Sequence, residues 1–201
     1  MRFIVVIFFI LIQTHIINAQ KFPSDLWHEG KLVLEDGDTL KGNVKYDLEK
    51  DLIQLDVNNK LESMTARKVV FFEIFDKTIK AYRQFYSLPF AASGGYKAPV
   101  FFELLSEGKL TLLSRESIEY RNYPNTFYSY GSSSRLVLVN HYFILKENGN
   151  IEPFSGTKND VLDLMGNKSE QVAKYMKVNK LKVDNKYQFA MTVAYFNSLY
   201  K

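Results

Sequence analysis

The chain has 201 residues, of which 46% are hydrophobic and 24% are charged, and its formal net charge is +4. These values are ordinary for a packed domain and exclude a disordered chain, a collagen-like repeat and a multi-span membrane protein. Cysteine is absent, which excludes disulfides, thiolate metal sites and thiol nucleophiles. Because the small positive balance is spread along the chain, we expect no nucleic-acid partner.

The first residues have the organisation of a secretory signal peptide. Arg2 supplies a positive charge, Phe3 to Ile12 is an unbroken apolar run, and Ala19 offers a small residue for cleavage. A membrane-spanning helix needs about 20 apolar residues, whereas this run is interrupted at Gln13. We therefore predict a signal peptide over 1–19 and no stable membrane span after its removal. The mature chain is predicted to be periplasmic, associated with the outer envelope, or secreted.

Strand-like runs follow this leader. Lys31 to Glu35 leads into Asp36-Gly37, a strong hairpin signal because the turn requires positive φ, and a second strand is predicted from Thr39 to Tyr46. Residues 53–57 alternate between apolar and polar, the pattern of a half-buried antiparallel strand. The run over 66–75 is rich in β-branched and aromatic residues, and it predicts a strand that is buried on both faces.

Further strands are predicted in the second half of this region. One covers Ile79 to Phe85, and a loop with two prolines and two glycines over 89–99 follows it. A hairpin is predicted from Val100 to Ser114, turning at Gly108. Another hairpin is predicted from Arg135 to Phe154.

From Thr157 the spacing of apolar residues changes from two to about 3.6, which predicts helices. Thr157 and Asp160 have the pattern of a capping pair, and Gly166 is suited to end the first helix. Two further short helices are predicted, the last of them capped by Asp184. Lysines are dense from Lys174 to Lys186, and we assign them to a solvent-exposed helix face and the loop after it.

Together these elements predict an α+β fold in a single globular domain over 20–201. An antiparallel β-rich body of about eight to ten strands, barrel-like or a sandwich, covers 20–156. Two or three short helices over 157–201 follow it. We expect this helical tail to pack on the sheet, because short helices are unstable alone.

The sequence contains no motif that points to catalysis. Of the two histidines after the leader, His28 and His141, the second lies in a strand pattern, where a structural role is expected. Two acids in very apolar strands, Glu73 and Glu103, are expected either to point outward from their strands or to pair with Arg or Lys. A carboxylate pair for hydrolysis stays open as a weaker alternative. We predict no cofactor and no metal site, and a protein that is not an enzyme.

The candidate binding residues lie in an aromatic segment over 120–134, which is interleaved with Asn, Pro, Gly and Ser and is predicted to be a loop. Tyrosine rings can stack on sugars or contact a protein partner, and aperiodic loops of this length are often functional. The alternative is that the rings fold over an open end of the sheet and close the core. The candidates are Tyr120, Tyr123, Phe127, Tyr128 and Tyr130.

Several short motifs carry a resemblance to a known group. They are Gly30-Lys31-Leu32-Val33 leading to 36–42, Phe101 to Leu105 with Gly108, and the tail from Tyr195 to Leu199. In these motifs the chain resembles small exported proteins of unknown function from Bacteroidota. The resemblance implies an envelope or secreted location and carries over no catalytic or binding residue.

The predicted function is therefore a non-catalytic interaction or structural module of the cell envelope or the secreted fraction. Its predicted partner is an envelope protein, or a glycan if the aromatic segment forms a carbohydrate-binding module.

Overall fold

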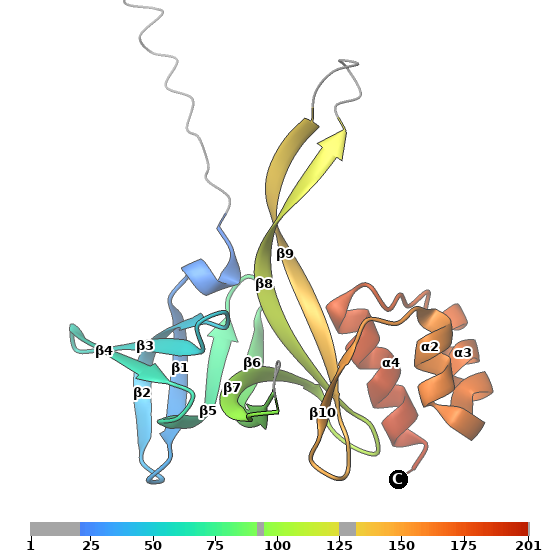
Figure 1. The fold of residues 1–201 in the computed structure, drawn as a ribbon, viewed down its shortest axis with the longest axis horizontal. Coiled ribbons are helices and arrows are strands. Elements are labelled where there is room, and N and C mark those ends of the chain that lie inside the picture. Colours follow the sequence, from blue (N-terminus) through green and yellow to red (C-terminus); the bar gives the residue numbers. More distant parts are fainter. Residues whose placement is uncertain (1–20, 92–94, 125–131, 201) are drawn as a thin grey trace, which may run out of the picture.

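The computed structural model describes residues 21–91, 95–124 and 132–200. It confirms the α+β prediction, because a ten-stranded antiparallel sheet is followed by three α-helices in this part of the chain (Figure 1). The predicted signal peptide over 1–19 lies outside the described residues. Within the described ranges, no helix is both long enough and apolar enough to cross a membrane.

The sheet is antiparallel throughout, and strands that are neighbours in the sheet are consecutive in the chain except where β5 pairs with β1. Its order is β10-β9-β8-β7-β6-β5-β1-β2-β3-β4, so that β1 lies between β5 and β2 and the two ends of the order, β10 and β4, are its edges. The strands are β1 (His28–Leu34), β2 (Thr39–Asp47), β3 (Leu52–Val57), β4 (Lys60–Thr65), β5 (Val69–Asp76), β6 (Ala81–Phe90), β7 (Ala98–Ser106), β8 (Thr111–Pro124), β9 (Ser132–Leu145) and β10 (Ile151–Phe154). The helices are α2 (Lys158–Leu164), α3 (Ser169–Val178) and α4 (Lys186–Ser198), with 3₁₀ turns η1 (Pro23–Asp25) and η2 (Gly166–Lys168).

The first hairpin forms at Asp36-Gly37 as predicted, with Gly37 at φ +91°. Further along the same two strands, Gly30 lies opposite Gly42. A Cβ atom at Gly30 would lie 2.5 Å from the carbonyl oxygen of Glu73, and one at Gly42 would lie 2.5 Å from that of Asp56. Because only glycine permits this approach, the pair lets the four neighbouring strands β5, β1, β2 and β3 pack closely where the sheet curls.

Three details of the sheet differ from the sequence predictions. Strand β4 was not predicted; it follows a two-residue turn at Asn58-Asn59, where both residues have positive φ. Strand β5 is not buried on both faces, because Val70 is exposed while alternate residues are buried. The predicted loop over 89–99 is shorter, since Pro89 and Pro99 lie opposite each other in β6 and β7. Two prolines can occupy a non-hydrogen-bonded pair, where neither strand needs an N–H group.

The core divides into two main clusters. Strands β1 to β7 curl around the first, and helices α2 to α4 pack on the end of the sheet around the second. Buried residues of the first cluster include Leu32, Val44, Tyr46, Ile53, Phe72, Phe85 and Phe101. Those of the second include Leu112, Ile144, Val161, Met176, Phe189 and Val193.

The helix ends follow the predicted capping in part. The capping box of Thr157 and Asp160 is present, and Gly166 has φ +52° just after α2. The prediction of Asp184 as the last cap is wrong by one residue. Asn185 has the extended backbone of an N-cap, and its side chain accepts a hydrogen bond from the N–H of Gln188.

Candidate functional site

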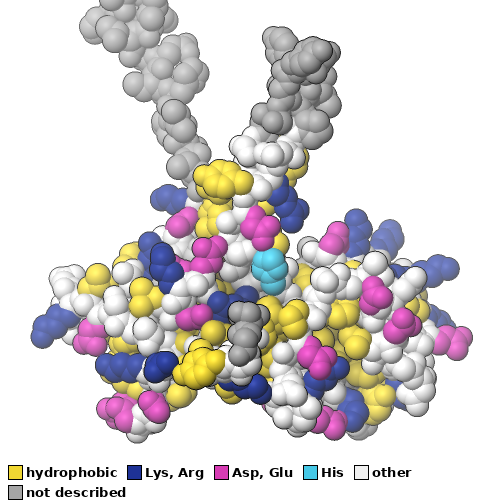
Figure 2. Space-filling model, in the orientation of Figure 1, with side chains coloured by type: hydrophobic (Ala, Val, Ile, Leu, Met, Phe, Trp, Pro, Cys, Tyr) yellow, Lys and Arg dark blue, Asp and Glu magenta, His cyan; other side chains and the backbone are white. Residues whose placement is uncertain are grey.

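Strands β8 and β9 extend well beyond the rest of the sheet. In the described part of the chain, β7 pairs with β8 as far as Ser114, and β10 pairs with β9 from Tyr142 onward. Residues 115–124 and 132–141 therefore form a two-stranded ribbon, which we call the arm, and it projects from the body (Figure 1). In the space-filling view, acidic and basic side chains are interspersed over the visible face of the body from which it rises (Figure 2).

The arm changes the interpretation of the aromatic segment. The prediction of a loop over 120–134 is wrong for 120–124 and 132–134, which are paired strand residues. Tyr120 is 75% exposed and Tyr123 is 43% exposed, so these two rings do not close the core. Tyr120 lies opposite Leu136, and the guanidinium of Arg135 lies 5.9 Å from the ring centroid of Tyr123. The other candidates, Phe127, Tyr128 and Tyr130, lie outside the described residues.

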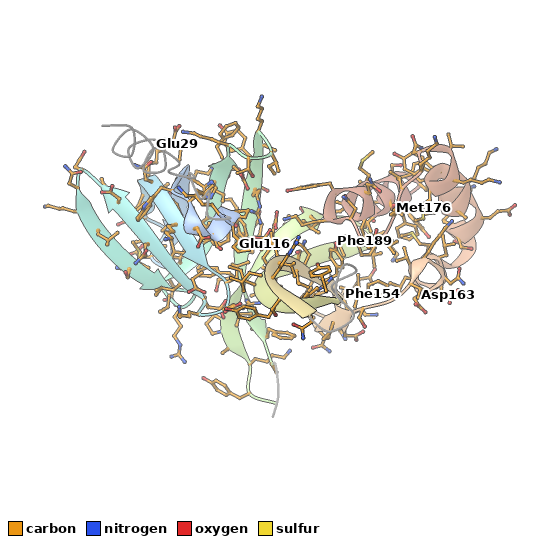
Figure 3. All side chains as sticks on the ribbon, turned by 90° about the horizontal axis from the view of Figure 1, so that it is seen from above. Glu29, Glu116, Phe154, Asp163, Met176 and Phe189 are labelled. Carbon is orange, nitrogen blue, oxygen red and sulfur yellow. The ribbon has the colours of Figure 1, made fainter. Side chains whose placement is uncertain are left out.

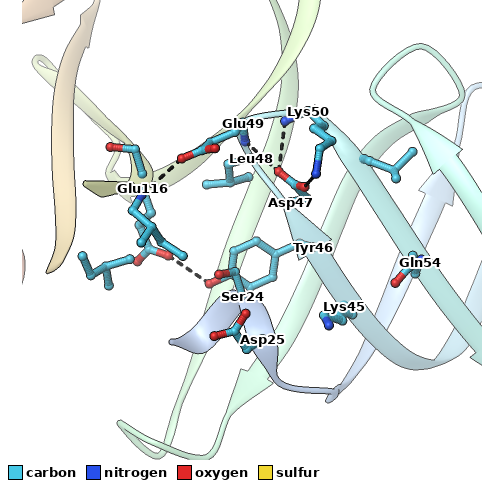
Figure 4. A pocket seen from close by; sticks show the side chains of 14 residues that line it. Ser24, Asp25, Lys45, Tyr46, Asp47, Leu48, Glu49, Lys50, Gln54 and Glu116 are labelled. Atoms are coloured by element: carbon cyan, nitrogen blue, oxygen red, sulfur yellow. Dashed lines mark hydrogen bonds and ion pairs between the residues drawn. The ribbon is translucent and has the colours of Figure 1, made fainter. Parts of the chain in front are cut away.

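At the base of the arm, one of its faces lines a cleft of about 400 Å³ (Figure 4). Strand alternation places Glu116, Ile118 and Tyr120 on this face. Ile118 and Leu138 of the arm form one wall of the cleft, and polar residues of β2, β3 and the turn between them form the other. The polar residues include Lys45, Asp47, Glu49, Lys50 and Gln54.

Beneath this cleft lies a buried network of charged side chains and one tyrosine. Tyr46 donates a hydrogen bond to Glu116 at 2.9 Å, the contact drawn in Figure 4. Arg83 donates to Glu116 at 2.6 Å and to Glu103 at 2.7 Å, and Lys186 bridges the same two carboxylates at 2.7 and 3.0 Å. The members of what we call the ion network are Tyr46, Asp76, Arg83, Glu103, Glu116 and Lys186, none more than 7% exposed.

The ion network joins the two halves of the molecule. Its members come from β2, β5, β6, β7, β8 and α4, and Glu116 lies between the curled strands and the helices (Figure 3). Buried charges are tolerated when they are paired and hydrogen-bonded, as they are here. We infer that the network fixes how the helices dock on the sheet.

The network holds Glu116 and Lys186 in their charged forms. Burial favours the neutral form of the Glu116 carboxyl, but the charges of Arg83 and Lys186 outweigh burial and lower its pKa. Burial likewise disfavours the charged form of Lys186, yet Glu103 and Glu116 raise the pKa of its ammonium group. Both groups therefore stay ionised near neutral pH.

We expect stability to fall when the solution is acidified below about pH 4.3, the usual pKa of an unfolded glutamate. Because the folded-state pKa of Glu116 is lowered, its contribution is complete above that pH and is lost as the pH falls through the folded value. Urea unfolding followed from pH 7 to pH 3 measures this effect, and the Glu116→Gln variant should show a weaker acid dependence. Equal acid dependence in both proteins would contradict the assignment.

The ion network does not have the properties of a carboxylate pair for hydrolysis. Glycoside hydrolysis requires one carboxyl with a raised pKa as the proton donor. Here Glu103 and Glu116 share the same two cations, and the pKa of Glu116 is lowered. The prediction that Glu73 and Glu103 pair with basic residues is confirmed, since Glu73 binds Lys31 at 3.0 Å.

A second polar cluster lies on the other face of the arm, around His141. Its Nε2 atom lies 2.9 Å from the hydroxyl of Ser117 and 3.0 Å from the carboxylate of Glu119. A serine triad needs the serine on one ring nitrogen and the acid on the other. Because both partners meet the same nitrogen, this cluster does not have the geometry of a triad. His28 is buried and its Nε2 contacts the carbonyl oxygen of Pro23, a structural role.

Sequence reasoning missed most of the ion network. It singled out Glu103 but not Arg83 or Glu116, and the prediction that Lys186 is exposed is wrong. Lys186 begins α4 and points at the sheet, where the two glutamates supply its counter-charge. The available signal was strand alternation, which places Arg83 on the same face as buried Phe85.

No protein-family model, no curated protein and no solved structure matches this chain. Among residues 21–91, 95–124 and 132–200, no three or more His, Asp or Glu side chains are grouped so that they could hold a metal ion.

Proposed function

We propose that this protein is an exported, non-catalytic interaction module of the cell envelope or the secreted fraction, and that it binds a protein partner through the arm. The observation that carries the proposal is the arm itself, with Tyr120 75% exposed opposite a partly exposed Leu136. The predicted leader over 1–19 and the resemblance to exported proteins support the location.

Without a partner, the arm leaves an apolar strip exposed to water. A two-stranded ribbon is marginally stable in water on its own, and an exposed apolar strip marks an interaction site. Ile118, Tyr120, Leu136 and Leu138 form such a strip on the cleft side of the arm. A partner that covered this strip would stabilise the arm, and tyrosines are among the residues that dominate binding energy at interfaces.

Replacing both Tyr120 and Tyr123 by serine is expected to abolish partner binding without unfolding the protein, because both side chains are exposed. The measurement is affinity capture from envelope extracts, comparing wild type with the double variant. Tyr96→Ser is the matched control, since Tyr96 is 73% exposed and lies outside the arm. A set of captured proteins that is the same for wild type and the double variant would contradict the proposal.

A glycan is the second candidate ligand, and the cleft favours it. The face that carries Tyr120 leads into a concavity lined by charged and amide side chains such as Lys45, Asp47 and Gln54. Sugars combine apolar ring faces with many hydroxyl groups, which suits a tyrosine beside polar donors and acceptors. Binding on a glycan array that is lost in the Tyr120→Ser, Tyr123→Ser protein supports this candidate, and an array without any signal rejects it.

A further inference from the structure

Four exposed lysines lie where helix α3 ends. Lys174 and Lys177 are on the helix, and Lys180 and Lys182 are in the loop that follows it. Val178, which is 70% exposed, is the last residue of the helix and lies between them in sequence. We call these five residues the basic patch. Because α3 lies on the side of the helical layer away from the sheet, the patch and the arm are separate surfaces (Figure 1).

The fold leaves the charge of the basic patch uncompensated. The sequence has no acidic residue over 171–183, and the acids that flank this stretch are Glu170 and Asp184. Lys31 and Lys77 of the sheet region each bind a carboxylate, whereas none of the four lysines of the patch does so within the described residues. The patch therefore carries surplus positive charge, which attracts an anionic partner.

Lys180 occupies a position where the helix end favours glycine. The N–H of Leu181 donates a hydrogen bond to the carbonyl oxygen of Met176, and that of Lys180 donates to Lys177, which is the pattern of a Schellman motif. The residue in the position of Lys180 has positive φ in this motif, here +54°, and it is usually glycine. A lysine there adds a charge at a cost in backbone energy, and the fold itself does not require it.

Apolar groups are exposed beside the lysines. A shallow hollow of about 370 Å³ adjoins Val178 and is lined by Tyr175 and Tyr195, whose ring centroids lie 3.9 Å apart in a stacked arrangement. Both tyrosines are half-buried, and a tyrosine with an apolar ring and a polar tip suits the boundary between water and lipid. Lysines around exposed apolar groups are typical of a surface that binds anionic lipids.

We propose that the basic patch docks this protein on an anionic membrane surface. The ammonium groups lie among the lipid phosphates, and Val178 enters the outer part of the acyl layer. Lysine supplies all the positive charge over 171–183. This suits a surface of many mobile headgroups, because arginine is favoured where one phosphate or carboxylate is held in a bidentate geometry. The inference does not depend on the partner proposed for the arm.

The test is flotation of the protein with lipid vesicles in a density gradient. The exported form is used, without the predicted leader over 1–19, because the apolar run of the leader would itself bind lipid. One set of vesicles contains phosphatidylglycerol and phosphatidylcholine in equal parts, and the other contains phosphatidylcholine alone. We expect the protein to float with the anionic vesicles only, and to dissociate from them in high salt, which screens exposed charges. Equal binding to both sets, or no binding to the anionic set, would overturn the proposal.

A double variant locates the surface. Lys180→Gly with Lys182→Gln should weaken binding to the anionic vesicles about tenfold, because each lysine near an anionic surface contributes to binding. Urea unfolding should show that this variant is no less stable than wild type, since glycine suits the position of Lys180. Lys41→Gln with Lys60→Gln is the matched control, because it removes the same charge from exposed lysines of β2 and β4. Unchanged binding in the first variant, or an equal loss in the control, would contradict the assignment.

Val178→Ser tests whether the surface enters a bilayer or binds a soluble polyanion. The side chain is exposed, so the variant should fold normally. We expect it to bind the anionic vesicles several-fold more weakly while the salt dependence is kept, because all four lysines remain. Binding as tight as that of wild type would reject a membrane and favour a soluble polyanion as the ligand.

Discussion

Replacing Arg83 by methionine is expected to lower the free energy of unfolding by about 3–5 kcal/mol, the usual cost of removing one partner of a buried ion pair. Arg83 donates hydrogen bonds to Asp76, Glu103 and Glu116, and all four side chains are buried. Without the guanidinium, Lys186 is the single remaining cation of the ion network. Urea unfolding at pH 7 measures the loss.

Two further proteins make this result specific. Lys77→Met breaks an exposed ion pair with Glu29, whose side chains are 66% and 72% exposed, and should leave the unfolding midpoint unchanged. With Arg83 replaced, Glu103 and Glu116 share the single cation Lys186, so adding Glu103→Gln removes an excess buried negative charge and the double variant should recover part of the lost stability. An Arg83→Met protein as stable as Lys77→Met would show that the network does not hold the two halves together.

The reason for an ion network at this place follows from the core. The two apolar clusters are separate, one inside the curled strands and one beneath the helices. Apolar side chains alone do not specify one docking angle between these two parts, since packing is tolerant of hydrophobic exchange. Six groups from six elements satisfy one another in one arrangement. We infer that the network contributes specificity of docking more than net stability, because apolar replacements of complete buried ion networks are often neutral.

Local signals made much of the fold predictable. The Asp36-Gly37 turn, the alternation over 53–57 and the capping box at Thr157 each depend on residues close in sequence, and each is confirmed. Strand β4 was missed because it is an edge strand with one deeply buried residue, Met64. An edge strand that is exposed along most of its length lacks the alternation of apolar and polar residues by which a half-buried strand is recognised.

The candidate site was less predictable, for two physical reasons. Toward the tip of the arm, residues 121–123 and 134–136 are exposed on both faces, so the sequence over 121–134 shows no hydrophobic alternation and resembles a loop. The ion network joins residues as far apart as Tyr46 and Lys186, and no local pattern reports such a contact. Lys186 was grouped with Lys174 and Lys182, which are exposed, because charge density alone does not show which lysine faces the sheet.

Replacing Gly108 by alanine is expected to destabilise the protein by about 3 kcal/mol or more, combining backbone strain with overpacking. Gly108 has φ +153°, and a Cβ atom there would lie 2.6 Å from the side chain of Asn197. Asn197 near the end of α4 exchanges hydrogen bonds with the backbone of Leu110 and donates to the carbonyl oxygen of Glu107. Urea unfolding measures the effect, with Gly149→Ala as control because it has φ +79° but no described atom within 4 Å.

A double-variant cycle separates the clash from the backbone strain. Asn197→Ala alone loses the hydrogen bonds that join α4 to the β7–β8 turn, so it should also be destabilising. In the combined variant the Cβ atom of residue 108 no longer meets the amide group and keeps only the 2.9 Å approach to the Cβ atom of residue 197, so the total loss should be smaller than the sum of the single losses. Strict additivity would contradict the contact. Gly108 and Asn197 therefore fasten the last helix to the sheet.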